Sequence, residues 1–183
     1  MSARLAKIIG NRNVTRLQAM LKYVLSFRHV YHWREDVPKT VIFMIDGRTP
    51  HGGLSDRLRG LFATYMYCKE RGYKFKVNWV YPFKLQDYLQ PASFDWTIES
   101  EDITHNKKYV AFRFFNSYSR MNNDEKGYYA ILDTKKPVEH VYSNVTMHEE
   151  RYAQLFKELF VLAEPLQLSV KQCLTQIGWG ISQ

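Results

Sequence analysis

The residues of this chain whose types and spacing could do chemistry gather in one stretch, "IDGRTPHGGLSDRLRGL", residues 45–61. Two glycines and a serine precede a predicted helix, and Arg57 and Arg59 fall in its first turn. Cations at this position oppose the helix dipole, at a cost of about 0.3–1 kcal/mol each. An anionic ligand or a carboxylate, for which Asp56 is a local candidate, would offset that cost. A solvated Asp–Arg surface of little energetic value is the alternative.

The elements on either side of this stretch predict a βα unit. The apolar run "TVIFMI", residues 40–45, predicts a strand that is buried on both faces. Apolar residues then recur at steps of four and three from Leu54 to Cys68, which predicts a helix with Ser55 as its N-cap and Gly72 at its C-terminus. "YKFKVNWV", residues 73–80, predicts the next strand and completes a right-handed βαβ crossover.

Ligands of such sheets bind beyond the carboxyl ends of the strands, so the loop after the first strand is the expected site. The loop has neither the lysine and spacing of a Walker loop nor the G-x-G-x-x-G pattern. We expect five of its residues to line one concave site at this edge, namely Gly52, Gly53, Ser55, Asp56 and Arg57.

The remainder of the chain predicts an α/β fold. "PFKLQDYLQP", residues 82–91, indicates a short helix, and "KKYVAFRFFN", "GYYAILDT" and "VEHVYSNV" indicate three strands. Two helices follow, over residues 148–160 and 166–177. The predicted fold class is α/β, with a Rossmann-like, mostly parallel sheet and flanking helices. The α/β domain is expected to span residues 38–178, between a basic leader helix, residues 1–37, and a short tail, residues 179–183.

Length and charge limit the classes of function. With 183 residues, of which 45% are apolar, the chain suits one domain with a substantial core. A formal charge of +8 favours an anionic partner, which leaves nucleic acid, an anionic membrane surface and phosphorylated small molecules open. Cys68 and Cys173 fall on apolar helix faces and are expected to be buried thiols in a reducing compartment, and no zinc pattern is present.

The leader lacks the apolar core of a signal peptide, because four cations from Arg4 to Arg16 interrupt every apolar run. Residues 14–31 show a helical apolar stripe with basic residues scattered around it. Scattered charge favours docking of this helix on the body of the protein over binding to lipid, although a weak contact with an anionic membrane remains open. We therefore expect a cytoplasmic protein, peripheral at the inner membrane at most.

The stretch from "FMIDGRTPHGGLSDRLRGLFATYMYCKERGYKFKVNWVYPFKLQDYLQP" to "DW" at Asp95-Trp96 resembles the N-terminal half of bacterial fucosyltransferase-like proteins of surface-polysaccharide clusters. These are relatives of the α-1,2- and α-1,6-fucosyltransferases and the protein O-fucosyltransferases. In them, a glycine-containing loop followed by Asn or Asp and Arg opens the first long helix. The resemblance is specific over residues 41–96 and loose from there to about residue 177.

The resemblance implies a GT-B fold, in which the acceptor lies mostly against the first half and the nucleotide sugar binds mainly to the second. The family's donor motif is a strand that ends in His-x-Arg, and only His32-Trp33-Arg34 matches its letters, ahead of the first strand. The sequence ends about where the donor strand is expected. We therefore expect half of an enzyme that has a glycan as acceptor and that binds GDP-fucose only together with a second domain.

The resemblance also assigns roles to the loop residues. Inverting fucosyl transfer in this class commonly needs no metal or other cofactor, because arginines neutralise the leaving diphosphate. Arg57 is then expected to reach into the cleft, and Asp46 is the candidate general base, with His51 and Asp56 as rivals. An Asx turn is an equally good interpretation of Asp46. The expected catalytic residues are Asp46 and Arg57, and the expected substrate-binding residues are His51, Gly52, Gly53, Ser55, Asp56 and Arg59.

Two other classes of function stay open from the sequence. Interleaved cations and aromatics such as "KKYVAFRFF" are typical of single-strand nucleic-acid binding, but the charge is spread along the chain and no RNP pattern appears, so nucleic acid is not expected as a partner. A non-catalytic scaffold remnant is the second alternative. Four aromatics are expected in the core rather than on a sugar-binding surface, namely Trp79, Phe83, Tyr88 and Trp96.

Overall fold

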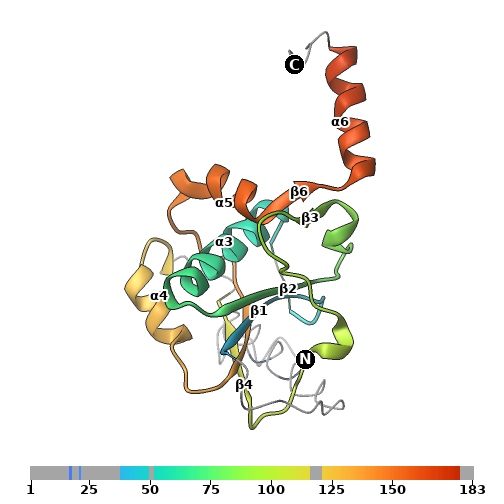
Figure 1. Ribbon diagram of the computed structural model, residues 1–183. Coiled ribbons are helices and arrows are strands. Elements are labelled where there is room, and N and C mark those ends of the chain that lie inside the picture. Colours follow the sequence, from blue (N-terminus) through green and yellow to red (C-terminus); the bar gives the residue numbers. More distant parts are fainter. Residues whose placement is uncertain (1–16, 18–20, 22–37, 50–51, 116–120, 178–183) are drawn as a thin grey trace, which may run out of the picture.

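A computed structural model describes residues 17, 21, 38–49, 52–115 and 121–177 of the chain. Its centre is a four-stranded parallel sheet in the order β2-β1-β5-β4 (Figure 1). The strands are β1 (Thr40–Ile45), β2 (Lys74–Trp79), β4 (Val110–Phe114) and β5 (Val138–Tyr142). The fold class is therefore α/β and Rossmann-like, as the sequence predicts.

Strand β1 lies in the interior of the sheet and pairs with β2 on one side and β5 on the other. All six of its residues are buried, so the continuous apolar run "TVIFMI" is explained by a strand that is covered on both faces. Helix α3 (Leu54–Arg71) follows β1 and ends at Gly72, which adopts a left-handed φ of 66°. The predicted βαβ unit is confirmed.

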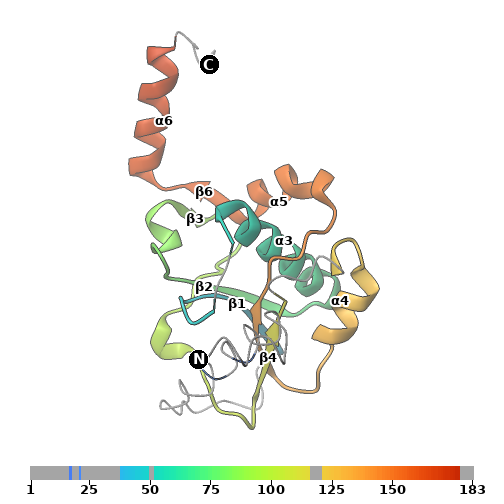
Figure 2. The same cartoon turned by 180° about the vertical axis from the view of Figure 1, so that it is seen from behind.

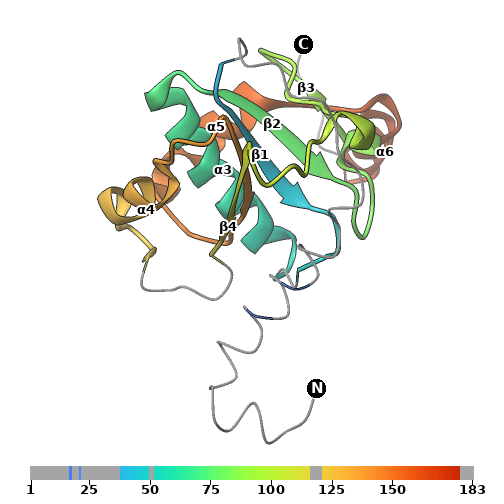
Figure 3. The ribbon, with the colours of Figure 1, turned by 90° about the horizontal axis from the view of Figure 1, so that it is seen from below.

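The helices that cover the sheet lie on one face. Helices α3, α4 (Glu125–Leu132) and α5 (Tyr152–Leu159) pack with β1 side chains such as Val41 and Phe43, and Figure 3 shows the three helices on the same side. The steps from β1 to β2 and from β4 to β5 run in the same direction across the sheet. Right-handed crossovers therefore place α3 and α4 on the same face and the return from β2 to β4 on the other.

The second face of the sheet is covered by irregular chain instead. Ile98 and Ile103, from the connection between β2 and β4, pack there on Ile42, Met44 and Val138. This connection contains the short 3-10 helices η1 (Leu85–Asp87) and η2 (Ser100–Asp102) and the strand β3 (Leu89–Pro91). Within the described residues, no α-helix contributes to the core of this face.

The structure corrects two of the predicted elements. Residues 127–134 were expected to form a strand, but they belong mostly to α4, whose N-cap Asp124 accepts a hydrogen bond from the Gly127 N–H. A parallel step from β4 to β5 needs a crossover, so topology overrides the strand-like composition of this segment. The expected helix over residues 82–91 is only η1 followed by β3, and β3 pairs antiparallel with β6 (Phe160–Leu162).

The C-terminal part of the described chain leaves the body of the protein. Helix α5, which is preceded by the 3-10 helix η4 (Glu149–Arg151), buries Leu155 and Leu159, whereas α6 (Glu164–Gln176) buries no residue and extends away from the sheet (Figures 1 and 2). Cys68 is buried as expected, but Cys173 on α6 is exposed, because the apolar stripe of α6 has no packing partner in the described structure.

Of the leader, only Leu17 and Leu21 are described; both are helical, with exposed fractions of 41% and 48%. The other residues of the predicted leader helix, and the predicted tail, lie outside the described residues. Among the described helices, none has the length and apolar character needed to cross a membrane.

Candidate functional site

The loop from Asp46 to Gly53 joins the carboxyl end of β1 to the first turn of α3. Helix α3 begins one residue before Ser55, with Gly53 as its N-cap in an extended conformation. The Arg57 N–H donates to the Gly53 carbonyl at 3.2 Å, and no side chain caps the helix. The predicted N-cap role of Ser55 is therefore wrong, because the extended Gly53 starts the helix earlier.

A glycine inside α3 sets how closely this helix approaches the sheet. A Cβ atom on Gly60 would lie 1.9 Å from the carbonyl oxygen of Ser143, the residue that follows β5. No side chain fits in that space, so Gly60 lets the helix backbone touch the carboxyl end of β5. This contact holds the first two turns of α3 at the carboxyl edge of the sheet.

Arg57 connects the two loops that leave β1 and β2. Its Nε donates to the Gly52 carbonyl at 3.1 Å and its Nη1 donates to the Tyr81 carbonyl at 3.0 Å. Its guanidinium also lies 5.9 Å from the ring centroid of the buried Trp79. Arg57 thus lies at the carboxyl edge, on the side of the first strands, and two of its donor groups bind backbone carbonyls.

Arg59 lies on a different side of α3 and lines a hollow of about 490 Å³. Its Nη1 is 3.4 Å from Asp56 Oδ1 and its Nε is 3.9 Å from Glu149 Oε1, so two carboxylates offset the cation in the first helical turn. The hollow lies between the start of α3 and the segment of η4 and α5. It is lined by apolar side chains and a few polar ones: Leu54, Ser55, Leu58, Arg59, Phe62, Glu149 and Tyr152.

Asp46 is almost enclosed, with 6% of its side chain exposed. Its Oδ1 accepts the Arg48 N–H at 3.0 Å, which is an Asx turn, and its Oδ2 accepts from Arg48 Nη1 at 3.1 Å and from the Tyr142 hydroxyl at 2.9 Å. Three donors therefore hold the carboxylate in place. A role as general base would require a substrate hydroxyl to replace one of them.

Two histidines extend this polar cluster beneath the sheet's second face. Arg48 Nη1 lies 3.5 Å from His105 Nε2, and the ring of His105 stands edge-on to that of His140 with centroids 5.0 Å apart. Burial lowers the pKa of His140 well below its ordinary value, and the nearby His105 and Arg48 lower it further. His140 is therefore held neutral at physiological pH.

The structure thus divides the predicted site residues between the two sides of the α3 N-terminus. Arg57 faces the ends of β1 and β2, whereas Ser55 and Arg59 line the hollow beside η4. Asp56 packs against Gly52, where a Cβ would lie 2.0 Å from Asp56 Oδ2. Gly53 has open space around it, and His51 lies outside the described residues.

Sequence reasoning missed several residues of this region. Glu149 on η4 and Tyr152 at the start of α5 come almost a hundred residues later, so no local pattern signals them. Arg48 and Tyr81 had a usable signal, because each follows the carboxyl end of a predicted strand. The glycine at position 60, inside a regular helical pattern, was a second signal, since an interior glycine often marks a close backbone approach.

A second hollow, of about 440 Å³, lies toward the opposite end of the sheet on its second face. Thr40, Lys74 and Val138, the first residues of three strands, form part of its wall. Two other lining residues are paired: Lys76 Nζ donates to the Asp95 carbonyl at 2.9 Å and to the Asp95 carboxylate at 3.2 Å. This hollow is remote from the loop between β1 and α3.

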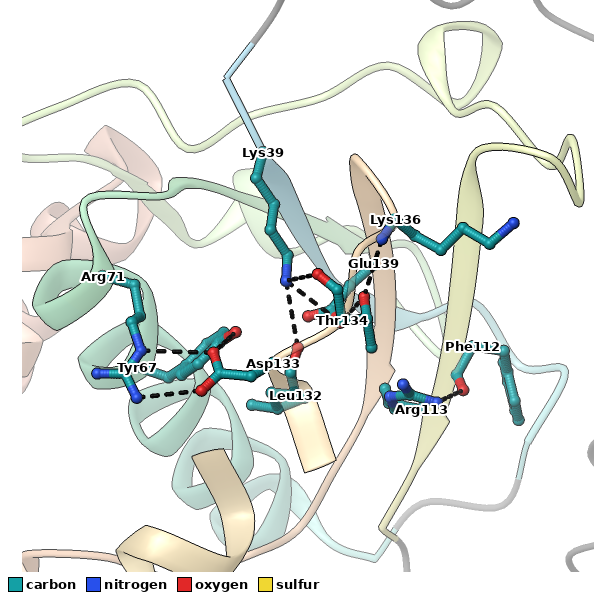
Figure 4. A network of polar contacts seen from close by, with 10 residues as sticks. All are labelled: Lys39, Tyr67, Arg71, Phe112, Arg113, Leu132, Asp133, Thr134, Lys136 and Glu139. Atoms are coloured by element: carbon teal, nitrogen blue, oxygen red, sulfur yellow. Dashed lines mark hydrogen bonds and ion pairs between the residues drawn. The ribbon is translucent and has the colours of Figure 1, made fainter. Parts of the chain in front are cut away.

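A buried ionic network occupies the amino end of the sheet (Figure 4). Glu139 is fully buried, and its Oε1 accepts from the Thr134 hydroxyl at 2.7 Å and lies 3.5 Å from Lys39 Nζ. Burial raises the pKa of Glu139, although Thr134 and Lys39 counteract that shift. Beside this buried pair, the partly exposed Asp133, whose pKa is lowered mainly by its hydrogen bond from Arg71, accepts from the Tyr67 hydroxyl at 2.9 Å.

In the described part of the chain, no group of three or more His, Cys, Asp or Glu side chains is arranged to hold a metal ion. Comparisons with protein-family models, with curated protein sequences and with solved structures find no match.

Proposed function

We propose that this chain is the acceptor-side half of a fucosyltransferase-like glycosyltransferase of surface-polysaccharide synthesis. The observation that carries the proposal is the hollow at the start of α3, which is lined by Ser55 and Arg59 from the segment that resembles the family. Phe62 and Tyr152 add aromatic surface to it, and Glu149 adds a carboxylate. Apolar walls with a few polar groups are typical of small-ligand sites, and a sugar ring needs both.

In this proposal, the polar groups of the edge have separate tasks. Glu149 and Ser55 hydrogen-bond to acceptor hydroxyls, and Arg59 contributes positive charge toward the diphosphate of GDP-fucose when a second domain supplies the donor site. Asp46 and Arg48 form an oriented ion pair at the end of β1, and Asp46 acts as base only if a hydroxyl replaces one of its donors. No cofactor takes part.

The proposal extends to partners and location. A glycan acceptor binds this chain, whereas the nucleotide sugar binds productively only in a cleft closed by two domains, because the reaction requires exclusion of water. We place the protein in the cytoplasm, with at most a weak contact between its basic leader and the inner membrane.

Calorimetry and a transfer assay on the purified chain test the proposal. GDP and GDP-fucose should bind weakly, no fucose should be transferred to a mixed panel of oligosaccharides, and at least one oligosaccharide should bind. Removal of one well-placed hydrogen-bond donor that stabilises the leaving group commonly costs about 2.7–4 kcal/mol of transition-state stabilisation. Absence of the whole domain that binds GDP-fucose should therefore abolish turnover. Glu149→Ala should weaken oligosaccharide binding, whereas Glu150→Ala, on the same 3-10 helix but outside the hollow, should not.

Three results would contradict the proposal. Micromolar affinity for GDP, or turnover above background, would place the donor site in this chain. Absence of binding to every oligosaccharide of the panel would remove the acceptor role. Tight binding to a single-stranded oligonucleotide that falls steeply with salt would favour the nucleic-acid class instead.

A further inference from the structure

We infer that the exposed ring of Tyr81 is a stacking surface for a pyranose ring of the acceptor, an inference that rests on the proposed function. Tyr81 follows β2 after one residue and is 56% exposed; Val80 beside it is 43% exposed, whereas Trp79 at the end of the strand is fully buried. Single exposed aromatic residues are common on protein surfaces, so a binding role for Tyr81 depends on how firmly the residue is held and on where it stands in the fold.

The backbone of Tyr81 is held by both neighbouring loops. Its N–H donates to the Ile45 carbonyl at 3.1 Å, at the end of β1, and its own carbonyl accepts from Arg57 Nη1 at 3.0 Å. Its side chain packs against Gly47, which has a φ of +76°, and a Cβ there would lie 3.0 Å from Cγ of Tyr81. Gly47 therefore provides a flat backbone support on which the ring lies.

Tyr81 also stands at the place in the fold where ligands are expected. The connection that leaves β1 runs to α3 on one face of the sheet, and the connection that leaves β2 reaches the other face at Ile98 and Ile103. Adjacent strands whose connections diverge in this way leave a crevice at their carboxyl ends. Arg57 spans that position between the two loops, and so it acts as a positioning residue for Tyr81.

The chemistry of this surface suits a sugar. A pyranose presents one apolar C–H face, which packs on an aromatic ring, and hydroxyls at its rim, which need polar partners. The guanidinium of Arg57, which binds the Tyr81 carbonyl, supplies a charged polar group beside Tyr81. A fixed aromatic ring loses little conformational entropy when a ligand binds.

The other aromatics of this region are less suited to this role. Trp79 and Trp96 are fully buried, as the sequence predicts, and Phe83 is partly buried between Trp79 and Tyr88. Tyr88 is 46% exposed, so its predicted place in the core is wrong, but it lies at the end of η1 with its ring edge-on to Phe83. Tyr88 therefore provides a matched control of the same residue type and similar exposure.

Saturation-transfer NMR on the full chain tests the inference. The probes are the methyl glycosides of galactose, N-acetylglucosamine and mannose at millimolar concentration, followed by calorimetry with whichever binds. We expect the ring protons on the apolar face of the sugar to receive the strongest saturation. Tyr81→Ala should weaken binding roughly tenfold and remove that proton pattern, whereas Tyr81→Phe, which keeps the ring, and Tyr88→Ala should stay within about twofold of the native chain.

Each outcome separates this inference from the proposed function. If a glycoside binds and Tyr81→Ala changes neither its affinity nor the proton pattern, the stacking role is overturned and the acceptor function stands. If no glycoside or oligosaccharide binds to the native chain, both fail. A melting temperature of Tyr81→Ala equal to that of Tyr88→Ala shows that any loss of binding does not come from unfolding.

Discussion

At the amino end of the sheet, Lys39 is nearly buried and Glu139 is fully buried, and the two bind each other and nearby polar groups of the chain. At the carboxyl edge, by contrast, Arg48 and Arg57 are partly exposed. Lys39 donates to the carbonyls of Leu132 and Thr134 at 3.2 and 3.1 Å, which leaves its ammonium enclosed by the protein. Arg57 also binds carbonyls, but those of loops that border solvent.

The comparison shows that the same types of charged residue serve different purposes at the two ends of one sheet. A buried ion pair contributes little net stability relative to apolar residues, yet it is costly to break, so it fixes the chain in one arrangement. At the carboxyl edge, the partly exposed Arg57 holds the loops at Gly52 and Tyr81, and this leaves their backbone and the Tyr81 ring accessible to a ligand. The amino end therefore serves the fold, and the carboxyl edge is where function is proposed.

The largest expected effect is at the amino end. Lys39→Met should lower the free energy of unfolding by about 3–5 kcal/mol, because it leaves the buried Glu139 carboxylate without its cation. Urea denaturation measures this loss. Lys171→Met, on the exposed helix α6, is the matched control and should be neutral. The double change Lys39→Met with Glu139→Leu should recover most of the stability, and equal losses in the single and double variants would contradict the ion-pair explanation.

Gly60→Ala should destabilise the protein by about 1–3 kcal/mol, because the added methyl group collides with the Ser143 carbonyl and pushes α3 from the carboxyl edge. Helix propensity alone predicts the opposite sign, a gain of about 1 kcal/mol. Thermal unfolding decides between the two. Gly53→Ala, where a Cβ meets open space, should cost less than about 1 kcal/mol; a stabilising Gly60→Ala would refute the close approach.

A pH effect of intermediate size is expected from His140. Its pKa is lowered well below the ordinary value by burial, with His105 and Arg48 adding to the shift, so the unfolded chain takes up a proton near pH 6.5 that the folded chain does not. The neutral His140 therefore costs the folded state nothing above that pH. Below it, the free energy of unfolding falls with the pH, with a slope of up to about 1.4 kcal/mol per pH unit.

Denaturation curves between pH 7 and pH 5 measure that slope. His140→Gln should remove it, whereas His148→Gln should retain it, because 39% of the His148 side chain is exposed. A slope that survives in His140→Gln would assign the effect to another group.

The smallest expected effect is at the carboxyl edge itself. Arg57→Ala should cost about 1 kcal/mol, because two hydrogen bonds to backbone carbonyls are lost at a partly exposed site. Hydrogen exchange should quicken at the N–H of Tyr81 more than at the N–H of Val138 at the amino end. Arg57→Lys keeps the charge but not the forked geometry, so it should resemble Arg57→Ala. Equal exchange rates in native and variant chains would show that Arg57 does not connect the loops.

Much of the fold could be predicted from local pattern. The apolar run of β1, the alternation in β2 and the steps of four and three in α3 each follow from a single element and its burial. Residues 127–134 could not be read in this way, because "YYAIL" has a strand-like composition, and only the parallel pairing of β4 with β5 requires a helix there. The N-terminus of α3 was predicted two residues late because Ser55 is a better intrinsic cap than Gly53.

The candidate site was predictable only in part. Asp46, Asp56, Arg57 and Arg59 follow from the position of one loop, but their partners do not. Glu149 and Tyr152 reach the hollow, and Tyr142 reaches Asp46, through sequence separations of about ninety residues or more. Tyr81 was overlooked because its exposure depends on how two loops meet, which no local periodicity encodes.

By itself, the sequence determined the order of β1, α3 and β2, the α/β class and the loop in which charged side chains gather, because burial periodicity and turn chemistry act over a few residues. The tertiary structure alone decided that α3, α4 and α5 share one face, that Arg57 binds the Tyr81 carbonyl, and that Arg59 faces a hollow closed by Glu149. These contacts join segments far apart in the chain, and strand order, which fixes them, is set by the packing of the whole sheet.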